Sequence, residues 1–192
     1  MANLIYVAKV LFEPRSAFKA LFRYHPDLGS LTLYLPWAWV SLWNRQEAIS
    51  RFADSGPGLF GVAIIIPVAL LHAWIWVHLL SFSVFYGGKL VGSSLDFNRV
   101  RLVVKWSVIP SFLSACIALL HAGGASVSLN TSLYAMLMLL GVPAIGYVWS
   151  FIILISGVNA LQNNRIQAIA SVCLIPGVLL LLLLGWYFLG GA

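Results

Sequence analysis

Long apolar runs, separated by short gaps that hold nearly all of the charged residues, constrain what this chain can fold into. Hydrophobic residues make up 61% of its 192 residues and charged residues only 8%, whereas a soluble domain carries about 45–50% apolar and about 25% charged residues. A water-soluble fold of this length cannot bury so much apolar surface. The sequence therefore predicts an all-α protein, a polytopic integral membrane helical bundle.

Five apolar segments are candidates for transmembrane helices, each of which needs about 20 residues to cross a bilayer core. The first is the shortest and contains Pro36, and its tryptophans Trp37, Trp39 and Trp43 suit a membrane interface. We expect residues 1–27 to form a cytoplasmic segment and residues 28–192 to form one five-helix transmembrane domain. The expected spans are residues 28–43, 58–86, 103–121, 131–157 and 166–189.

Basic residues fall mainly in alternate gaps, which predicts the orientation of the chain. One side receives nine Lys and Arg residues, and the other receives only Arg45 and Arg51. Because basic residues in short loops stay cytoplasmic, the N-terminus is expected inside and the C-terminus outside. The net charge of +6 then indicates anionic membrane lipids as partners, and no nucleic acid. The nine are Lys9, Arg15, Lys19, Arg23, Lys89, Arg99, Arg101, Lys105 and Arg165.

The segment from Pro14 to Tyr24 predicts an amphipathic helix, since proline suits the first helical position. Cations recur every four residues along one edge, and apolar side chains share the opposite arc. We expect this helix to lie in the cytoplasmic interface with lipid headgroups at Arg15, Lys19 and Arg23, joined by Lys9. An equally weighted interpretation, which does not exclude the first, is that the helix merely packs on the membrane domain. The apolar side chains are Ala17, Phe18, Leu21, Phe22 and Tyr24.

Ionisable residues inside the spans are few, namely His72, His78 and His121. A separation of six residues puts His72 and His78 about 240° apart around a helix, so they form no local two-ligand metal site. We favour neutral, hydrogen-bonded packing histidines. The alternative is that His72 or His78 lines a polar path.

Small residues recur at four-residue spacing in the third expected span and form a face on which another helix can approach closely. We favour packing within the bundle over a homodimer seam. The residues of this face are Ser107, Ser111 and Ala115, with Ser114 and Ala118 beside them.

Sequence motifs of soluble enzymes are missing, including G-x-S-x-G, H-E-x-x-H and C-x-x-C. We therefore expect no catalytic, cofactor-binding or metal-binding residues, and we interpret Tyr86-Gly87-Gly88-Lys89 as a helix stop on the cytoplasmic face. The favoured hypothesis is a non-enzymatic interaction or membrane-organising protein. The alternatives are a small transporter or channel with a polar path near His72 and His78, and, least favoured, an intramembrane enzyme.

The stretch formed by Gly87-Gly88-Lys89, residues 96–105 and Trp106-Ser107-Val108-Ile109-Pro110 resembles the central signature of the Yip family, the Ypt-interacting proteins and their bacterial relatives. Leu11-Phe12-Glu13-Pro14 followed by Ala17-Phe18 is also similar to that family. So are residues 149–157 and residues 163–168. The resemblance covers nearly the whole chain in order.

The Yip resemblance implies a short bacterial-type member in the inner membrane that organises lipids or other membrane proteins, with self-association as a further option. Eukaryotic members of the family bind Rab-type GTPases through a long cytoplasmic N-terminal region and act in vesicle traffic. Because only 27 residues precede the first expected span here, we do not expect a Rab-type GTPase as a partner.

The basic asymmetry makes the location of the C-terminus testable. Alkaline phosphatase fused after Ala192 should be active, because that enzyme folds only outside the cytoplasm, and green fluorescent protein at the same position should stay dark. An active cytoplasmic reporter with a silent periplasmic one would contradict the five-span topology.

Overall fold

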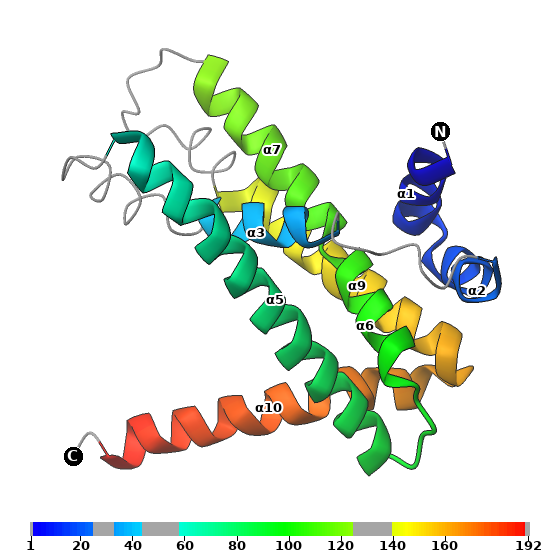
Figure 1. Cartoon of the computed structure of the whole chain (residues 1–192). Coiled ribbons are helices and arrows are strands. Elements are labelled where there is room, and N and C mark those ends of the chain that lie inside the picture. The colour runs from blue at the N-terminus through cyan, green and yellow to red at the C-terminus, as the bar shows by residue number, and fades with distance from the viewer. Residues whose placement is uncertain (1, 25–32, 44–57, 125–139, 191–192) are drawn as a thin grey trace. The chain divides into compact units, whose positions relative to one another are not determined.

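The computed structural model describes residues 2–24, 33–43, 58–124 and 140–190. These residues form eight α-helices and no strand (Figure 1), so the prediction of an all-α chain is confirmed for them. In chain order the helices are α1 (Ala2–Phe12), α2 (Pro14–Tyr24), α3 (Tyr34–Trp43), α5 (Gly58–Leu90), α6 (Phe97–Ser107), α7 (Ile109–Gly124), α9 (Val142–Gln162) and α10 (Arg165–Gly190).

Three helical stretches of the described chain are long and apolar enough to cross a membrane, namely Ile66–Leu90, Phe97–Ala118 and Val142–Gln162. The first and third leave many large apolar side chains exposed, such as Leu71 at 58% and Val148 at 62%. A soluble protein rarely exposes contiguous apolar surface on this scale. The composition and burial of these helices are those of a membrane protein.

The helix bounds differ in places from the expected spans. The third expected span, residues 103–121, is built from α6 and α7, which are separated at Val108. Pro110 explains the interruption, because it has no N–H to donate to the carbonyl of Trp106. The first expected span corresponds to the ten-residue α3, and residues 28–32 and 131–139 of the expected spans lie outside the described residues.

The predicted helix stop at Gly87-Gly88-Lys89 is wrong, because α5 continues to Leu90. The helix ends instead at Gly92, which has a φ of 76°, a conformation that glycine adopts without steric cost. The N–H of Gly92 donates to the carbonyl of Lys89 at 3.1 Å, and the N–H of Ser93 donates to that of Gly88 at 2.9 Å. This pair of bonds is the Schellman motif, which satisfies the last carbonyls of a helix.

The chain divides into two compact units, which we describe separately. Unit 1 comprises residues 1–26, 77–104 and 154–192, and unit 2 comprises residues 27–76 and 105–153. Helices α5, α6 and α9 contribute residues to both units.

In unit 1, glycines allow helices to approach closely. A Cβ added at Gly87 on α5 would overlap the carbonyl oxygen of Ser171 on α10. A Cβ added at Gly157 on α9 would lie 2.8 Å from the ring of Phe18 on α2. Phe18 is itself fully buried, so unit 1 joins α2 and α10 to the ends of α5 and α9 through contacts that only glycine permits.

In unit 2, small residues of α7 pack against α9. The hydroxyls of Ser111 and Ser150 are 2.7 Å apart, and the N–H of Ser111 also donates to Ser150 at 3.2 Å. A Cβ at Gly146 would overlap the side chain of Ser114. All five residues predicted to form a packing face are buried, namely Ser107, Ser111, Ser114, Ala115 and Ala118.

Helix α3 joins the same unit through small and aromatic residues. Ala38 on α3 shares a buried cluster with Ala69 and Ala73 on α5, against which Trp37 packs. The ring of Trp39 meets that of Phe112 on α7 edge-on, with centroids 6.5 Å apart. Trp37 is half-buried and Trp39 is 40% exposed, while the side chain of Trp43 lies outside the described ones.

The glycine contact between α5 and α10 yields a test of the packing. Gly87→Ala should lower the free energy of unfolding by about 1–3 kcal/mol, because the added methyl group would overlap the backbone of Ser171 and force α5 and α10 apart. Gly177→Ala, within α10, is the matched control, since nothing lies within 4 Å of its added Cβ. Thermal unfolding in detergent, followed by tryptophan fluorescence, should show a loss for the first variant and none for the second. Equal melting temperatures for both variants would contradict the close packing.

Candidate membrane-interface site

Positive charge gathers in unit 1. Within the described residues this unit holds eight Lys and Arg side chains, against the two carboxylates of Glu13 and Asp96. The described part of unit 2 holds one basic residue, Lys105, and no acidic residue. The eight are Lys9, Arg15, Lys19, Arg23, Lys89, Arg99, Arg101 and Arg165. Unit 1 is therefore the strongly basic part of the described chain.

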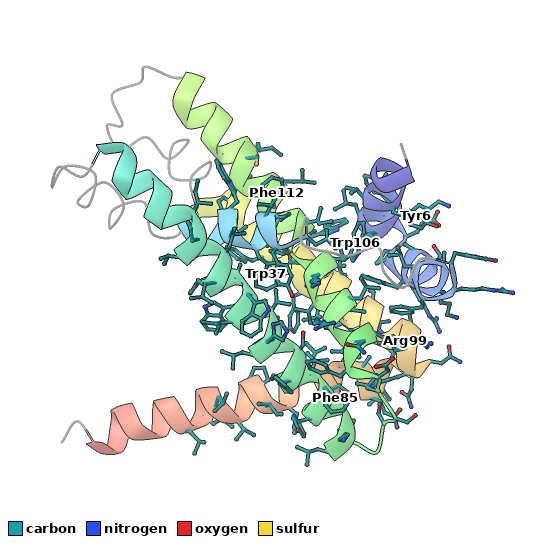
Figure 2. The ribbon with its side chains drawn as sticks, in the orientation of Figure 1. Tyr6, Trp37, Phe85, Arg99, Trp106 and Phe112 are labelled. Carbon is teal, nitrogen blue, oxygen red and sulfur yellow. The ribbon has the colours of Figure 1, made fainter. Side chains whose placement is uncertain are left out.

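The connection between α5 and α6 carries rings and cations together. The ring of Phe97 lies 4.7 Å from that of Phe82 and 5.7 Å from that of Phe85, between centroids. The Nζ atom of Lys89 lies 4.6 Å from the centre of the Phe85 ring, and the guanidinium of Arg101 lies 6.0 Å from that of Phe97. We call this set the aromatic–basic cluster; its members are Phe82, Phe85, Tyr86, Lys89, Phe97 and Arg101. Figure 2 labels Phe85 at this end of α5 and Arg99 near the start of α6.

Local backbone chemistry holds the two sides of the cluster in place. The Schellman turn at Gly92 ends α5, and the carboxylate of Asp96 accepts the N–H of Asn98 at 3.0 Å to cap α6. Asn98 in turn accepts a hydrogen bond from Arg101 at 3.1 Å. Lys89 and Arg101 thus come from helix ends with satisfied backbone groups. The sequence analysis missed this cluster, although aromatic residues at helical spacing before Lys89 were a signal for it.

The four predicted headgroup residues have different surroundings. Arg15 donates a 2.7 Å hydrogen bond to the side-chain oxygen of Asn163, at the turn between α9 and α10. Asn163 has a φ of 55°, a left-handed conformation that asparagine tolerates better than most residues. Lys9, Lys19 and Arg23 are exposed. Arg15 therefore ties α2 to the protein, while the other three present their charges outward.

The apolar side of α2 is covered by protein. Ala17, Phe18 and Leu21 are each at most 1% exposed, and Phe18 lies close to Gly157. Phe22 is half-buried with the guanidinium of Arg99 6.0 Å from its ring, and Tyr24 is 62% exposed. Packing of this face within unit 1 is thus observed, and the placement of its basic edge among lipids stays a prediction.

A buried amide links the two connections of unit 1. The Nε2 atom of Gln162 at the end of α9 donates to the hydroxyl of Ser93 and to that of Ser171, each at 2.8 Å. The hydroxyl of Ser171 in turn donates a hydrogen bond to the backbone carbonyl of Gln167 at 2.7 Å. The Oε1 atom of Gln162 is buried without a hydrogen-bond partner. Because buried polar groups are normally paired, the two hydrogen bonds of the Nε2 atom restrict how α9, α10 and residue 93 can be arranged.

The histidines considered for a polar path are half-buried. The Nε2 atom of His72 accepts a 2.6 Å hydrogen bond from Trp76, one turn along the same helix. His72 belongs to unit 2 and His78 to unit 1. Within the described residues no three His, Cys, Asp or Glu side chains are grouped so that they could hold a metal ion.

Lys105, counted among the cytoplasmic cations in the first turn of the third expected span, is buried in the protein. It is only 8% exposed, and its Nζ atom lies 4.4 Å from the centre of the Tyr34 ring. The neighbouring apolar residues Val103, Val104 and Trp106 were a signal for this burial, because they continue the apolar segment on both sides of the lysine. A cation above an aromatic face is stabilised by the ring quadrupole.

No family model matches the sequence, and comparison with curated proteins and with solved structures found no similar protein. The interpretation of the site therefore depends on its own geometry.

The buried amide can be tested by substitution. Gln162→Leu should lower the free energy of unfolding by about 1–3 kcal/mol, because the hydroxyl oxygens of Ser93 and Ser171 lose the N–H donor that Gln162 supplies. Gln167→Leu makes the same chemical change at a half-buried position whose contribution comes from its backbone carbonyl, so it should have little effect. Thermal unfolding of the two variants in detergent compares them directly. A larger loss for Gln167→Leu would contradict this role of Gln162.

Proposed function

We propose that the chain is a non-enzymatic, multi-pass membrane protein of the Yip type that binds anionic lipids at its basic cytoplasmic end and organises membrane lipids or other membrane proteins. The supporting observation is the concentration of basic side chains in unit 1. Bilayers whose cytoplasmic leaflet is anionic attract such surfaces, with about 1 kcal/mol for each cation near the surface. The proposed location is the bacterial inner membrane.

The arrangement of helix ends supports five spans with the N-terminus inside. The connection between α5 and α6 and the connection between α9 and α10 both belong to unit 1. The hydrogen bond between Gln162 and Ser93 joins them. Consecutive spans alternate in direction, so these two connections should lie on one side of the membrane, and their basic residues favour the cytoplasm for that side. The remaining span of the proposal contains α3.

The N-terminal cations complete this basic surface. The buried apolar face of α2 and the bond between Arg15 and Asn163 hold the helix against unit 1. Lys9, Lys19 and Arg23 remain exposed. In this proposal α2 is attached to the membrane domain by protein contacts and offers its basic edge to anionic headgroups, so the two interpretations of the segment hold together.

The transporter alternative receives less support from the described contacts. A polar path near His72 would use its two ring nitrogens, and one of them, Nε2, accepts a hydrogen bond from Trp76. The serines between α7 and α9 bond to one another beside the close contact of Gly146. These contacts have the pattern of helix packing.

Lipid preference of the whole protein tests the proposed function. The chain reconstituted in phosphatidylcholine vesicles with rising phosphatidylglycerol content should prefer spin-labelled phosphatidylglycerol over phosphatidylcholine at low salt. Replacing Lys9, Lys19 and Arg23 by Gln should weaken that preference, with an upper limit of about 3 kcal/mol if the contributions add. Arg15 is left unchanged because it binds Asn163.

The double variant Arg45→Gln, Arg51→Gln serves as the control, because those residues are expected on the other side of the membrane. It should leave the preference for lipid in the cytoplasmic leaflet unchanged. An unaltered preference after loss of the three N-terminal cations, or none in the wild-type protein at any salt concentration, would contradict the proposal.

A further inference from the structure

The aromatic–basic cluster combines cations with an exposed apolar stripe. Leu79, Phe82, Tyr86 and Leu90 follow one another at three- and four-residue intervals on α5, so they share one face of that helix. Their exposed fractions are 54%, 45%, 51% and 70%. The stripe begins inside the candidate span Ile66–Leu90 and ends beside Lys89. It therefore leads from apolar membrane depth to a positive charge at the helix end.

The cations of the cluster are held on rings and lack acidic partners. Among the residues that the structure describes, Asp96 pairs with Arg99 at 3.7 Å, and no carboxylate lies within ion-pair distance of Lys89 or Arg101. Arg101 bonds to the neutral amide of Asn98. Ring faces attract a cation without neutralising it, so both charges remain available to an anion.

Lys89 and Arg101 each lie near one of two aromatic rings that contact each other. Lys89 lies over Phe85, Phe85 meets Phe97 at an interplanar angle of 83°, and Arg101 lies by Phe97. Lys89 also approaches the ring of Tyr86, at 5.8 Å. An ammonium and a guanidinium on adjoining rings provide several N–H donors for the oxygens of a phosphate group.

We propose that the aromatic–basic cluster binds the phosphate of an anionic phospholipid, whose acyl chain lies along the stripe of Leu79, Phe82 and Tyr86. This inference rests on the proposed function and adds a defined site to it, separate from the N-terminal cations. The stripe favours a lipid over a free anion, because a soluble phosphate would leave that exposed apolar face uncovered. Aromatic residues and snorkelling lysines are typical of the depth at which headgroups lie.

Binding of a short-chain lipid to the full chain in neutral detergent tests the site. Native mass spectrometry with dihexanoyl phosphatidylglycerol should show tighter binding than with dihexanoyl phosphatidylcholine. Lys89→Gln or Arg101→Gln should each weaken phosphatidylglycerol binding about fivefold, and the double variant about 25-fold if the effects add. Phe97→Leu, which keeps apolar bulk but removes the shared ring, should weaken it about two- to fivefold.

Two controls separate a defined site from general attraction. Arg165→Gln removes an exposed cation of the same unit that has no ring contact in the cluster, and it should change binding less than twofold. The exchange Lys89→Arg with Arg101→Lys keeps both charges and should bind within about twofold of the wild-type protein. This exchange variant also keeps the test valid if the uncharged double variant fails to fold.

Several outcomes would overturn the site. Equal losses for Arg165→Gln and Lys89→Gln would show a diffuse positive field, and competition by millimolar glycerol phosphate or inorganic phosphate would show a free-anion site. Unchanged binding in the double variant, with loss in the variant lacking Lys9, Lys19 and Arg23, would refute the cluster and leave the proposed function intact. A wild-type protein that binds both lipids equally would refute the proposed function itself.

Discussion

The close approach of α10 to α5 at Gly87 is the constraint on which unit 1 depends. Because no side chain intervenes, the carbonyl of Ser171 can lie where a Cβ would otherwise be. That position brings the hydroxyl of Ser171 within 2.8 Å of the amide of Gln162. The same amide reaches Ser93, immediately after the turn that ends α5. Steric freedom at one glycine thus allows a polar network that ties together three helices and a connection.

Lipid and protein satisfy different parts of this chain. Apolar side chains of α5 and α9 are left exposed over much of their length, which is favourable in hydrocarbon and costly in water. Some polar side chains inside the helices are instead hydrogen-bonded to nearby protein groups, as in the pair Ser111 and Ser150 and in the bond between Trp76 and His72. Because hydrocarbon offers no hydrogen bonds, these side chains find their partners within the protein.

Helix α2 shows how one short segment can meet two demands. Phe18 and Leu21 are fully buried, and Arg15 binds the turn at Asn163, so the helix is part of the packed structure. Its remaining cations, Lys19 and Arg23, are exposed. Protein contacts orient the helix, and a surface that needs no further packing is left for the lipid headgroups of the proposed function.

Composition and helical periodicity by themselves determined that this chain is helical and that it carries helices able to span a membrane, because exclusion of apolar residues from water operates on every segment separately. They also predicted the basic N-terminal segment and the small-residue face that runs from Ser107 at the end of α6 into α7, since both are repeats at helical spacing. The five-span topology rests on charge placement and stays a prediction.

Only the tertiary structure decided which residues meet. Gly87 and Gly88 have the local appearance of a helix stop, yet they lie within α5 and pack against Ser171, more than 80 residues later. Lys105 was expected among the cytoplasmic cations in the first turn of the third span, yet it is buried beside Tyr34. The aromatic–basic cluster likewise depends on Phe97 meeting Phe82 and Phe85 across a turn. Contacts between helices are set by steric fit and by pairing of polar groups that are distant in the sequence. The spacing of residues within one segment therefore does not predict them.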